Sequence, residues 1–219
     1  MKAVLFDMDG TLIDSEPLWL ESEQEVMAEL GYSWTIEDQA NCLGGPADKT
    51  ESYMQARAKK QMPAGYFMHE LGSRMYKKLS TNLKLIDGAI TLLKSVRSAG
   101  YKTALVTASP SILMSAALQK LPPELFDATV SCDDVPRSKP DPAPYLLAAK
   151  LLNEEISDCV VIEDSLTGIT SGLAAGAKVI GIPNIQSWSQ NRNLLQVKNL
   201  AAIDVAMIEK WWAGELSNV

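Results

Sequence analysis

The chain has 219 residues, of which 47% are hydrophobic and 21% charged, a composition typical of one large globular domain or of a domain with a smaller companion. Its formal net charge of -7 argues against nucleic acid and anionic membranes as partners, and no apolar run is long enough to span a bilayer. The three cysteines are far apart and the first residues show no signal-peptide pattern, so we expect reduced thiols in a cytoplasmic protein. We also expect a monomer, because the pattern indicates no large additional apolar face.

The first predicted element is a short strand from Lys2 to Phe6, followed at once by "DMDGT". From residue 15 to residue 84 the periodicity is helical. Ser15 is a candidate N-cap, and the first helix should turn one face of Leu18, Val26, Met27 and Leu30 inward. After a break at residues 44–46, the segments 48–62 and 65–79 predict two more amphipathic helices.

From residue 85 onward, strand and helix patterns alternate. Apolar strands of four to six residues are expected near residues 102–107, 128–132, 159–163 and 178–182, with helices at 89–100, 111–121, 142–152 and 165–176. This order predicts an α/β fold with a doubly wound, Rossmann-like parallel sheet as its core. The core would comprise residues 1–14 and 85–219, and residues 15–84 would form an inserted α-helical bundle, the cap.

Polar side chains follow the strands at the points where the strands end, and in such sheets the ligand crevice lies at that edge. Several carboxylates cannot all be ionised at close range without a cation, and hard oxygen ligands suit Mg²⁺. Lys139 adds a positive charge, and Thr107 a hydroxyl at the start of a helix whose N-terminus favours an anion. The set therefore fits a phosphoryl group. The candidate metal ligands are Asp7, Asp9, Glu163 and Asp164.

Four segments together resemble the motifs of the haloacid dehalogenase superfamily, in the branch with a helical cap after the first strand. In chain order they are "DMDGT", "VTAS", "SKPDP" and "IEDS". The resemblance covers nearly the whole chain, and the combination of the four motifs is highly specific.

This resemblance implies that Asp7 is a nucleophile forming an aspartyl-phosphate and that Asp9 is first the general acid and then the base. Thr107 and Lys139 would hold the phosphoryl oxygens, and Asp7, the carbonyl of Asp9 and Asp164 would hold Mg²⁺, with Glu163 in or beside that shell. The backbone would turn tightly under the phosphate at Gly10. The predicted substrate-binding residues are Gly10, Ala108 and Ser109 in the core, and Glu16, Trp19, Gly44 and Lys49 in the cap.

Several reactions share these motifs. The segment "LIDSEPLW" looks like that of phosphatases acting on small sugar or polyol phosphates, so a small phosphorylated metabolite is the expected substrate. The main alternative is a phosphohexomutase of the β-phosphoglucomutase type. Such mutases carry a histidine where this chain has Trp19, and their cap arginine has no clear counterpart between Gly44 and Lys49. An alternative of another class is a phospho-aspartate signalling module of the receiver type, although receivers are about half this length.

Overall fold

The computed structural model describes residues 1–42, 47–182 and 191–216. The chain divides into two compact units, one formed by Met1–Asp14 with Lys84–Val219 and the other by Ser15–Leu83. Each unit is described by itself below. Gly44, one of the predicted substrate-binding residues, lies outside the described residues.

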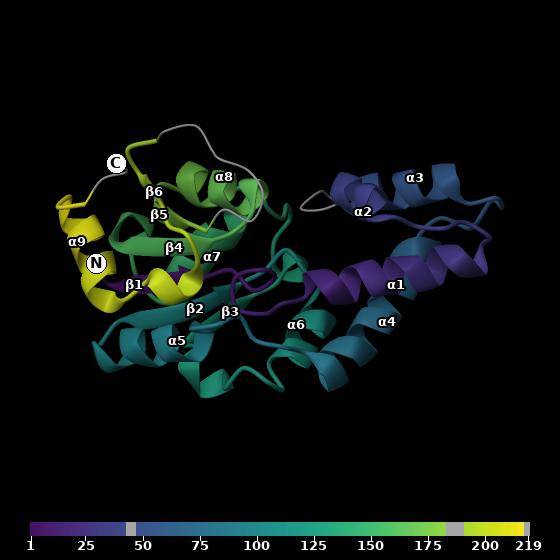
Figure 1. Ribbon diagram of the computed structural model, residues 1–219. Coiled ribbons are helices and arrows are strands. Elements are labelled where there is room, and N and C mark those ends of the chain that lie inside the picture. Colours follow the sequence, from purple (N-terminus) through teal and green to yellow (C-terminus); the bar gives the residue numbers. More distant parts are fainter. Residues whose placement is uncertain (43–46, 183–190, 217–219) are drawn as a thin grey trace. The chain divides into compact units, whose positions relative to one another are not determined.

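Within the described residues, six strands form one parallel sheet in the order β3-β2-β1-β4-β5-β6 (Figure 1). This doubly wound arrangement confirms the predicted α/β, Rossmann-like core. The sequence pattern did not predict β6, a strand of three residues. The strands are β1 (Ala3–Phe6), β2 (Lys102–Val106), β3 (Ala128–Val130), β4 (Cys159–Glu163), β5 (Lys178–Gly181) and β6 (Leu194–Gln196).

Helices cover both faces of the sheet. Figure 1 shows α5 and α8 on opposite sides of it, and α7 packs on the same side as α8. The α-helices of this unit are α5 (Ala89–Ser98), α6 (Ser111–Ala117), α7 (Ala143–Leu151), α8 (Leu166–Ala175) and α9 (Val205–Ala213). Short 3₁₀ turns are η1 (Pro123–Leu125), η2 (Cys132–Asp134), η3 (Ile156–Asp158) and η4 (Leu200–Ala202).

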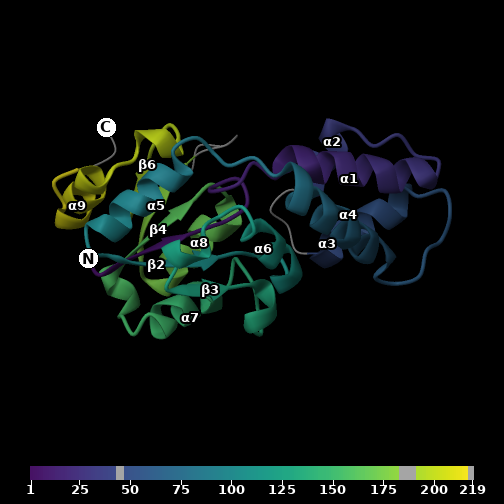
Figure 2. The same ribbon diagram turned by 90° about the horizontal axis from the view of Figure 1, so that it is seen from below.

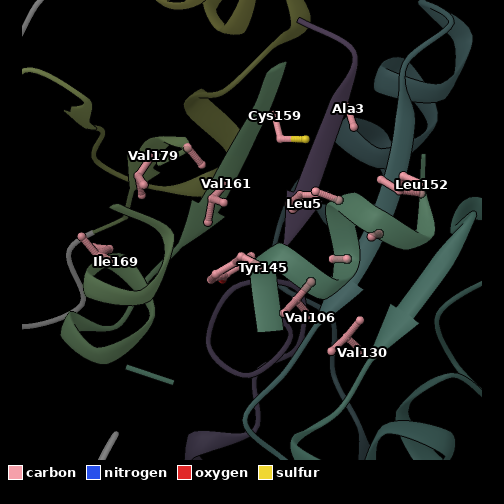
Figure 3. Packing of buried hydrophobic residues seen from close by; sticks show 14 of the residues in the cluster. Ala3, Leu5, Val106, Val130, Tyr145, Leu152, Cys159, Val161, Ile169 and Val179 are labelled. Carbon is pink, nitrogen blue, oxygen red and sulfur yellow. The ribbon is translucent and has the colours of Figure 1, made fainter. Parts of the chain in front are cut away.

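Alternation along the strands builds the core of this unit. Ala3 and Leu5 of β1 belong to the cluster under α7 and α8, while the equally buried Val4 and Phe6 point to the opposite face. Figure 3 shows Leu5, Val106 and Val161 from three neighbouring strands packed together in this cluster. Every residue of β1 and β4 is buried, because helices cover both faces, and this explains the uninterrupted apolar runs in the sequence.

The backbone hydrogen bonds of the sheet continue one residue past the ends of β1 and β2. They hold the residues that follow these strands at the carboxyl edge of the sheet. The amide of Asp7 donates to the carbonyl of Ile162 over 3.0 Å, and the amide of Thr107 donates to the carbonyl of Val130 over 2.8 Å. Asp7 therefore lies between the ends of β2 and β4, where the polar segments Thr107–Ser109 and Glu163–Ser165 emerge.

The second unit is a bundle of four α-helices in its described part: α1 (Glu16–Glu29), α2 (Ile36–Cys42), α3 (Ala47–Arg57) and α4 (Tyr66–Asn82). Helices α1 and α4 run side by side in both views (Figures 1 and 2). Helix α3 ends at Arg57 rather than near residue 62 as the pattern predicts. The buried core comprises Val26, Met27, Trp34, Cys42, Met54, Phe67 and Leu71.

Helix α1 buries a different face from the one that its apolar residues predict. Val26 and Met27 are buried as expected, but Leu18 and Leu30 are only half-buried, whereas the polar Ser22 and Glu23 are buried. The indole N–H of Trp34 donates to Glu23 Oε2 over 2.8 Å, which gives the buried carboxyl a partner. Burial raises the pKa of Glu23 to about 7, and the nearby Glu16 and Asp38 raise it further against the hydrogen bond from Trp34.

None of the helices in the described ranges has the length and apolar character needed to cross a membrane.

Candidate active site

Lys139 lies at the centre of a buried charge cluster at the carboxyl edge of the sheet. Its ammonium donates to Asp7 Oδ1 over 2.6 Å, to Glu163 Oε1 over 2.7 Å and to the carbonyl of Val106 over 2.8 Å. Three acceptors use all three N–H donors of a lysine. Although burial opposes it, the two carboxylates hold the pKa of Lys139 above its usual value, so this side chain stays charged.

Asp7 is only 6% exposed and receives its hydrogen bond from Lys139 on Oδ1 alone. Its second oxygen, Oδ2, accepts no hydrogen bond from the described part of the chain. Burial, followed by the charge of Glu163, raises the pKa of Asp7 to about 7 against the lowering effect of Lys139. Asp7 is therefore a buried carboxyl with one oxygen available for chemistry, and a cation beside it would stabilise its ionised form.

Glu163 is completely buried and accepts five hydrogen bonds. Oε1 receives Lys139 and the hydroxyl of Tyr145, the latter over 2.8 Å. Oε2 receives the amide of Asp164, and both the amide and the hydroxyl of Ser165. A carboxylate offers about four lone-pair positions, so these donors use its capacity fully. Glu163 can thus neutralise and orient its neighbours, but it has little capacity left to coordinate an ion directly.

Asp164 lies beside the turn that follows β1. Thr11 donates its hydroxyl to Asp164 Oδ1 over 3.3 Å. Gly10 has a φ of +78°, and a Cβ atom on it would lie 2.1 Å from Asp164 Oδ2. Glycine at position 10 therefore serves both the turn and the close approach of this carboxylate to the backbone.

Asp9 is held by the two hydroxyls that follow β2. Thr107 donates to Asp9 Oδ2 over 3.1 Å and Ser109 donates to the same oxygen over 2.9 Å. The amide of Ser109 in turn donates to the hydroxyl oxygen of Thr107 over 2.9 Å. Ala108, between them, is exposed. In this structure both hydroxyls thus orient a carboxylate, and Asp9 is brought next to the sequence segment predicted to bind phosphate.

The start of α6 is already paired with a carboxylate. The amide and the hydroxyl of Ser111 both donate to Asp133 Oδ2, over 2.8 and 2.7 Å. We predicted that this helix N-terminus would favour an anionic ligand. In the structure the carboxylate of Asp133 occupies that position.

The carboxylates fit a divalent cation. Ligand oxygens of Asp7, Glu163 and Asp164 lie within 4.8 Å of one another. They are hard donors, and Lys139 is the ammonium that faces them in the part of the chain that the structure describes. Because Glu163 is saturated with donors, Asp7 and Asp164 are the side chains best suited to hold Mg²⁺ here.

Three of the predicted residues of the helical unit are described. Glu16 lies half-buried in the first turn of α1, and its carbonyl accepts a hydrogen bond from Gln39 over 3.0 Å. Trp19 packs against the core of the bundle, and Lys49 is exposed on α3. Contact of Glu16, Trp19 and Lys49 with a substrate stays a prediction.

The sequence analysis missed residues that support the cluster from behind. Tyr145 and Ser165 donate to Glu163, and Thr11 donates to Asp164. Gly168 belongs with them, because a Cβ on it would lie 1.6 Å from Glu163 Oε1. Serine and glycine three residues apart after "IED" were a detectable signal, whereas Tyr145 looked like an ordinary core position of an apolar helix.

Comparison with known proteins defines the class. A family model described as haloacid dehalogenase-like hydrolase matches residues 4–182. The chain belongs to this family, as the four motifs predict, and it is an enzyme of the phosphatase type.

Two relatives that match over nearly their full lengths are phosphatases. The chain is 32% identical over 208 residues to a phosphorylated carbohydrates phosphatase of Thermotoga maritima, covering 93% of this chain and 94% of that protein. It is 31% identical over 210 residues to hexitol phosphatase B of Escherichia coli, covering 92% of each. A third relative is far longer: the match to SUPPRESSOR OF QUENCHING 1 of Arabidopsis thaliana, 33% identical, spans 83% of this chain but only 18% of that protein.

Among solved structures, CbbY from Rhodobacter sphaeroides in complex with phosphate superposes with a TM-score of 0.83. The two are 25% identical, and the match covers 95% of this chain and 99% of that one.

Proposed function

We propose that the chain is a Mg²⁺-dependent phosphatase that hydrolyses small phosphorylated sugars or polyols through an aspartyl-phosphate on Asp7. The observation that carries the proposal is the buried cluster in which Lys139 binds both Asp7 and Glu163, with Asp9 and Asp164 beside it. Similarity to two phosphatases over nearly their full lengths supports it. Three free cysteines agree with a cytoplasmic enzyme.

In the first step, Asp7 Oδ2 attacks phosphorus in line with the leaving oxygen. The bond from Oδ2 to phosphorus forms as the bond to the alkoxide breaks, and the carboxyl of Asp9 gives the alkoxide its proton. Thr107 and Ser109 keep Asp9 directed at the site through the hydrogen bonds to Oδ2. An ionised carboxylate needs no adjacent base to act as a nucleophile, unlike serine or threonine.

In the second step, a water molecule attacks the phosphoryl group, and Asp9 accepts its proton. The bond between phosphorus and Asp7 breaks, which releases inorganic phosphate and restores the carboxylate. Lys139 offsets negative charge throughout, since its ammonium is fixed beside Asp7. Bound between Asp7 and Asp164, Mg²⁺ would offset the charge of the carboxylates and of the phosphoryl oxygens.

The proposed substrate class is based on two relatives that match over nearly the whole chain, and not on the motifs of the sheet unit. The Thermotoga relative is a phosphatase of phosphorylated carbohydrates and the Escherichia relative a hexitol phosphatase. The core motifs would serve any phosphate monoester equally well. We therefore assign hexose and hexitol phosphates to this chain on the basis of these two relatives, with Trp19 in the helical unit favouring transfer to water over transfer to a sugar hydroxyl.

The test is release of inorganic phosphate from a panel of hexose, hexitol and shorter phosphates with Mg²⁺, beside conversion of β-glucose 1-phosphate to glucose 6-phosphate. We expect rapid release from hexose or hexitol phosphates and no isomer conversion. Asp7→Asn should abolish turnover without unfolding the chain, and EDTA should abolish turnover by the wild type. Isomer conversion faster than phosphate release would establish the mutase alternative, and turnover that survives EDTA would refute the metal-dependent mechanism.

A further inference from the structure

Tyr145 has no part in the reaction as proposed, yet its hydroxyl lies within the charge cluster. The side chain is completely buried and comes from α7, where Figure 3 shows it in the cluster that also holds Leu5, Val106 and Val161. Phenylalanine would fill the same space, so packing alone does not explain the hydroxyl. That hydroxyl donates to Glu163 Oε1 over 2.8 Å, and the ring centroid lies 5.0 Å from the ammonium of Lys139.

Lys139 faces a constraint during the proposed reaction. Its three N–H donors are all in use, so binding a phosphoryl oxygen requires one acceptor to be exchanged. The carbonyl of Val106 belongs to a central strand and cannot move. Of the two carboxylates, Asp7 changes its bonding in the reaction, whereas Glu163 is fixed by its other donors.

We infer that Tyr145 is a positioning residue that fixes Glu163, so that Glu163 and the Val106 carbonyl together aim the third N–H of Lys139 at the reacting group. This inference rests on the proposed function, because it concerns how Lys139 serves the same phosphoryl transfer.

The two oxygens of Glu163 are held by different numbers of donors, and the Tyr145 hydroxyl is one of only two on Oε1. Oε2 receives three hydrogen bonds from the segment at the start of α8, all from Asp164 and Ser165. Oε1 receives only Lys139 and Tyr145. Without the hydroxyl, Lys139 alone restrains Oε1, so the carboxylate can rotate about its Oε2 contacts and the ammonium can follow it.

The experiment compares the full-length wild type with Tyr145→Phe, using an aryl phosphate with Mg²⁺ and inhibition by orthovanadate and by inorganic phosphate. Phenylalanine keeps the ring against Lys139 and removes only the hydroxyl. We expect kcat to fall about tenfold with KM changed less than twofold, because orientation of charge matters most in the transition state. Inhibition by orthovanadate, which adopts the pentacoordinate geometry of phosphoryl transfer, should weaken by a similar factor, and inhibition by phosphate much less.

A matched control is Tyr101→Phe. The hydroxyl of Tyr101 also donates to a glutamate, Glu209 Oε1 over 2.6 Å, but on the surface and away from the cluster. This variant should keep wild-type kcat and vanadate inhibition. Thermal unfolding of both variants separates loss of stability from loss of positioning, since a purely structural hydroxyl would lower the melting temperature and leave the vanadate constant unchanged.

The outcomes are distinct. If the wild type turns over the ester and folded Tyr145→Phe stays within twofold of it in both kcat and vanadate inhibition, the positioning role is refuted. If Tyr145→Phe does not fold, Glu163→Gln replaces it, because Tyr145 is inferred to act through this carboxylate and its loss should lower kcat and weaken vanadate inhibition in the same paired way. Unchanged vanadate inhibition in that variant would refute the inference. A wild type without phosphatase activity refutes the proposed function instead.

Discussion

The sharpest test of the carboxylate cluster is Gly168→Ala, which adds one methyl group to helix α8. That Cβ would lie 1.6 Å from Glu163 Oε1 and 1.9 Å from its carboxyl carbon. Because nonbonded atoms approach to roughly 3.5 Å, either the carboxylate or the helix must move by about 2 Å. Displacing Glu163 breaks its contact with Lys139, so the methyl group tests whether this contact supports activity.

The magnitude follows from two opposing effects. Breaking a buried ion pair costs about 3–5 kcal/mol, whereas alanine in a helix interior gains about 1 kcal/mol over glycine, so we expect a net loss of roughly 2–4 kcal/mol. A displacement of about 1 Å in a catalytic group costs on the order of a hundredfold in rate, so kcat should fall at least that far.

Gly172→Ala provides the matched control, one turn further along the same helix. Its Cβ would lie 3.1 Å from Val179 and 3.3 Å from Val161, so these two buried methyl groups would have to shift by only a few tenths of an ångström, against about 2 Å at Gly168. Urea unfolding and aryl phosphate turnover would be measured on both variants. We expect Gly172→Ala to keep wild-type turnover, because its contacts lie in the sheet core and not at the carboxylates. If Gly168→Ala kept wild-type turnover and an unchanged unfolding midpoint, neither activity nor stability would depend on where the Glu163 carboxylate lies.

Two further predictions concern other polar contacts. Glu23 has a pKa of about 7 when folded against an ordinary value of 4.5, so the folded state binds more protons between these values and its stability falls as pH rises from about 4.5 to 7. The free energy of unfolding would be measured by urea at several pH values for the wild type and for Glu23→Gln. The variant should lack the pH-dependent loss, which amounts to up to about 3 kcal/mol in the wild type. The same pH dependence in both proteins would contradict a raised pKa of Glu23. Ser109→Ala removes one of two hydroxyls on Asp9 and should lower kcat about three- to tenfold. Ser115→Ala, which loses only an exposed hydroxyl bond to the Ile112 carbonyl, is its control, and equal kcat in both variants would refute the role.

The core could be predicted from sequence because its signals are local. Apolar runs of β-branched residues specify buried parallel strands, and polar residues directly after them must meet at one edge. Asp7, Thr107 and Asp164 come together for this reason. Of the donors to Glu163, Tyr145 could not be predicted in the same way, because it lies 18 residues before Glu163 in a mostly apolar helix, where a tyrosine looks like an ordinary core residue.

The buried face of α1 shows a second limit of pattern reasoning. Counting apolar side chains favoured Leu18 and Leu30 as core residues, yet the helix buries Ser22 and Glu23 instead. A polar residue is tolerated inside when its partner is present, and the partner here is Trp34, which follows the helix in a connecting segment. Hydrophobic periodicity carries no information about such a partner. Periodicity likewise does not encode whether Glu16, Trp19 and Lys49 contact a substrate.

Two glycines explain how four carboxylates can share this edge of the sheet. Gly10 makes room for Asp164 and Gly168 makes room for Glu163, since a Cβ at either position would lie within 2.1 Å of a carboxylate oxygen. A larger residue at either position would force the carboxylate and the backbone apart. Burial, followed by the charge of Glu163, raises the pKa of Asp7, and a cation beside it would offset both effects. Lys139 is the ammonium that faces these carboxylates in the described part of the chain, and this excess of negative charge supports the divalent cation that we propose for the site.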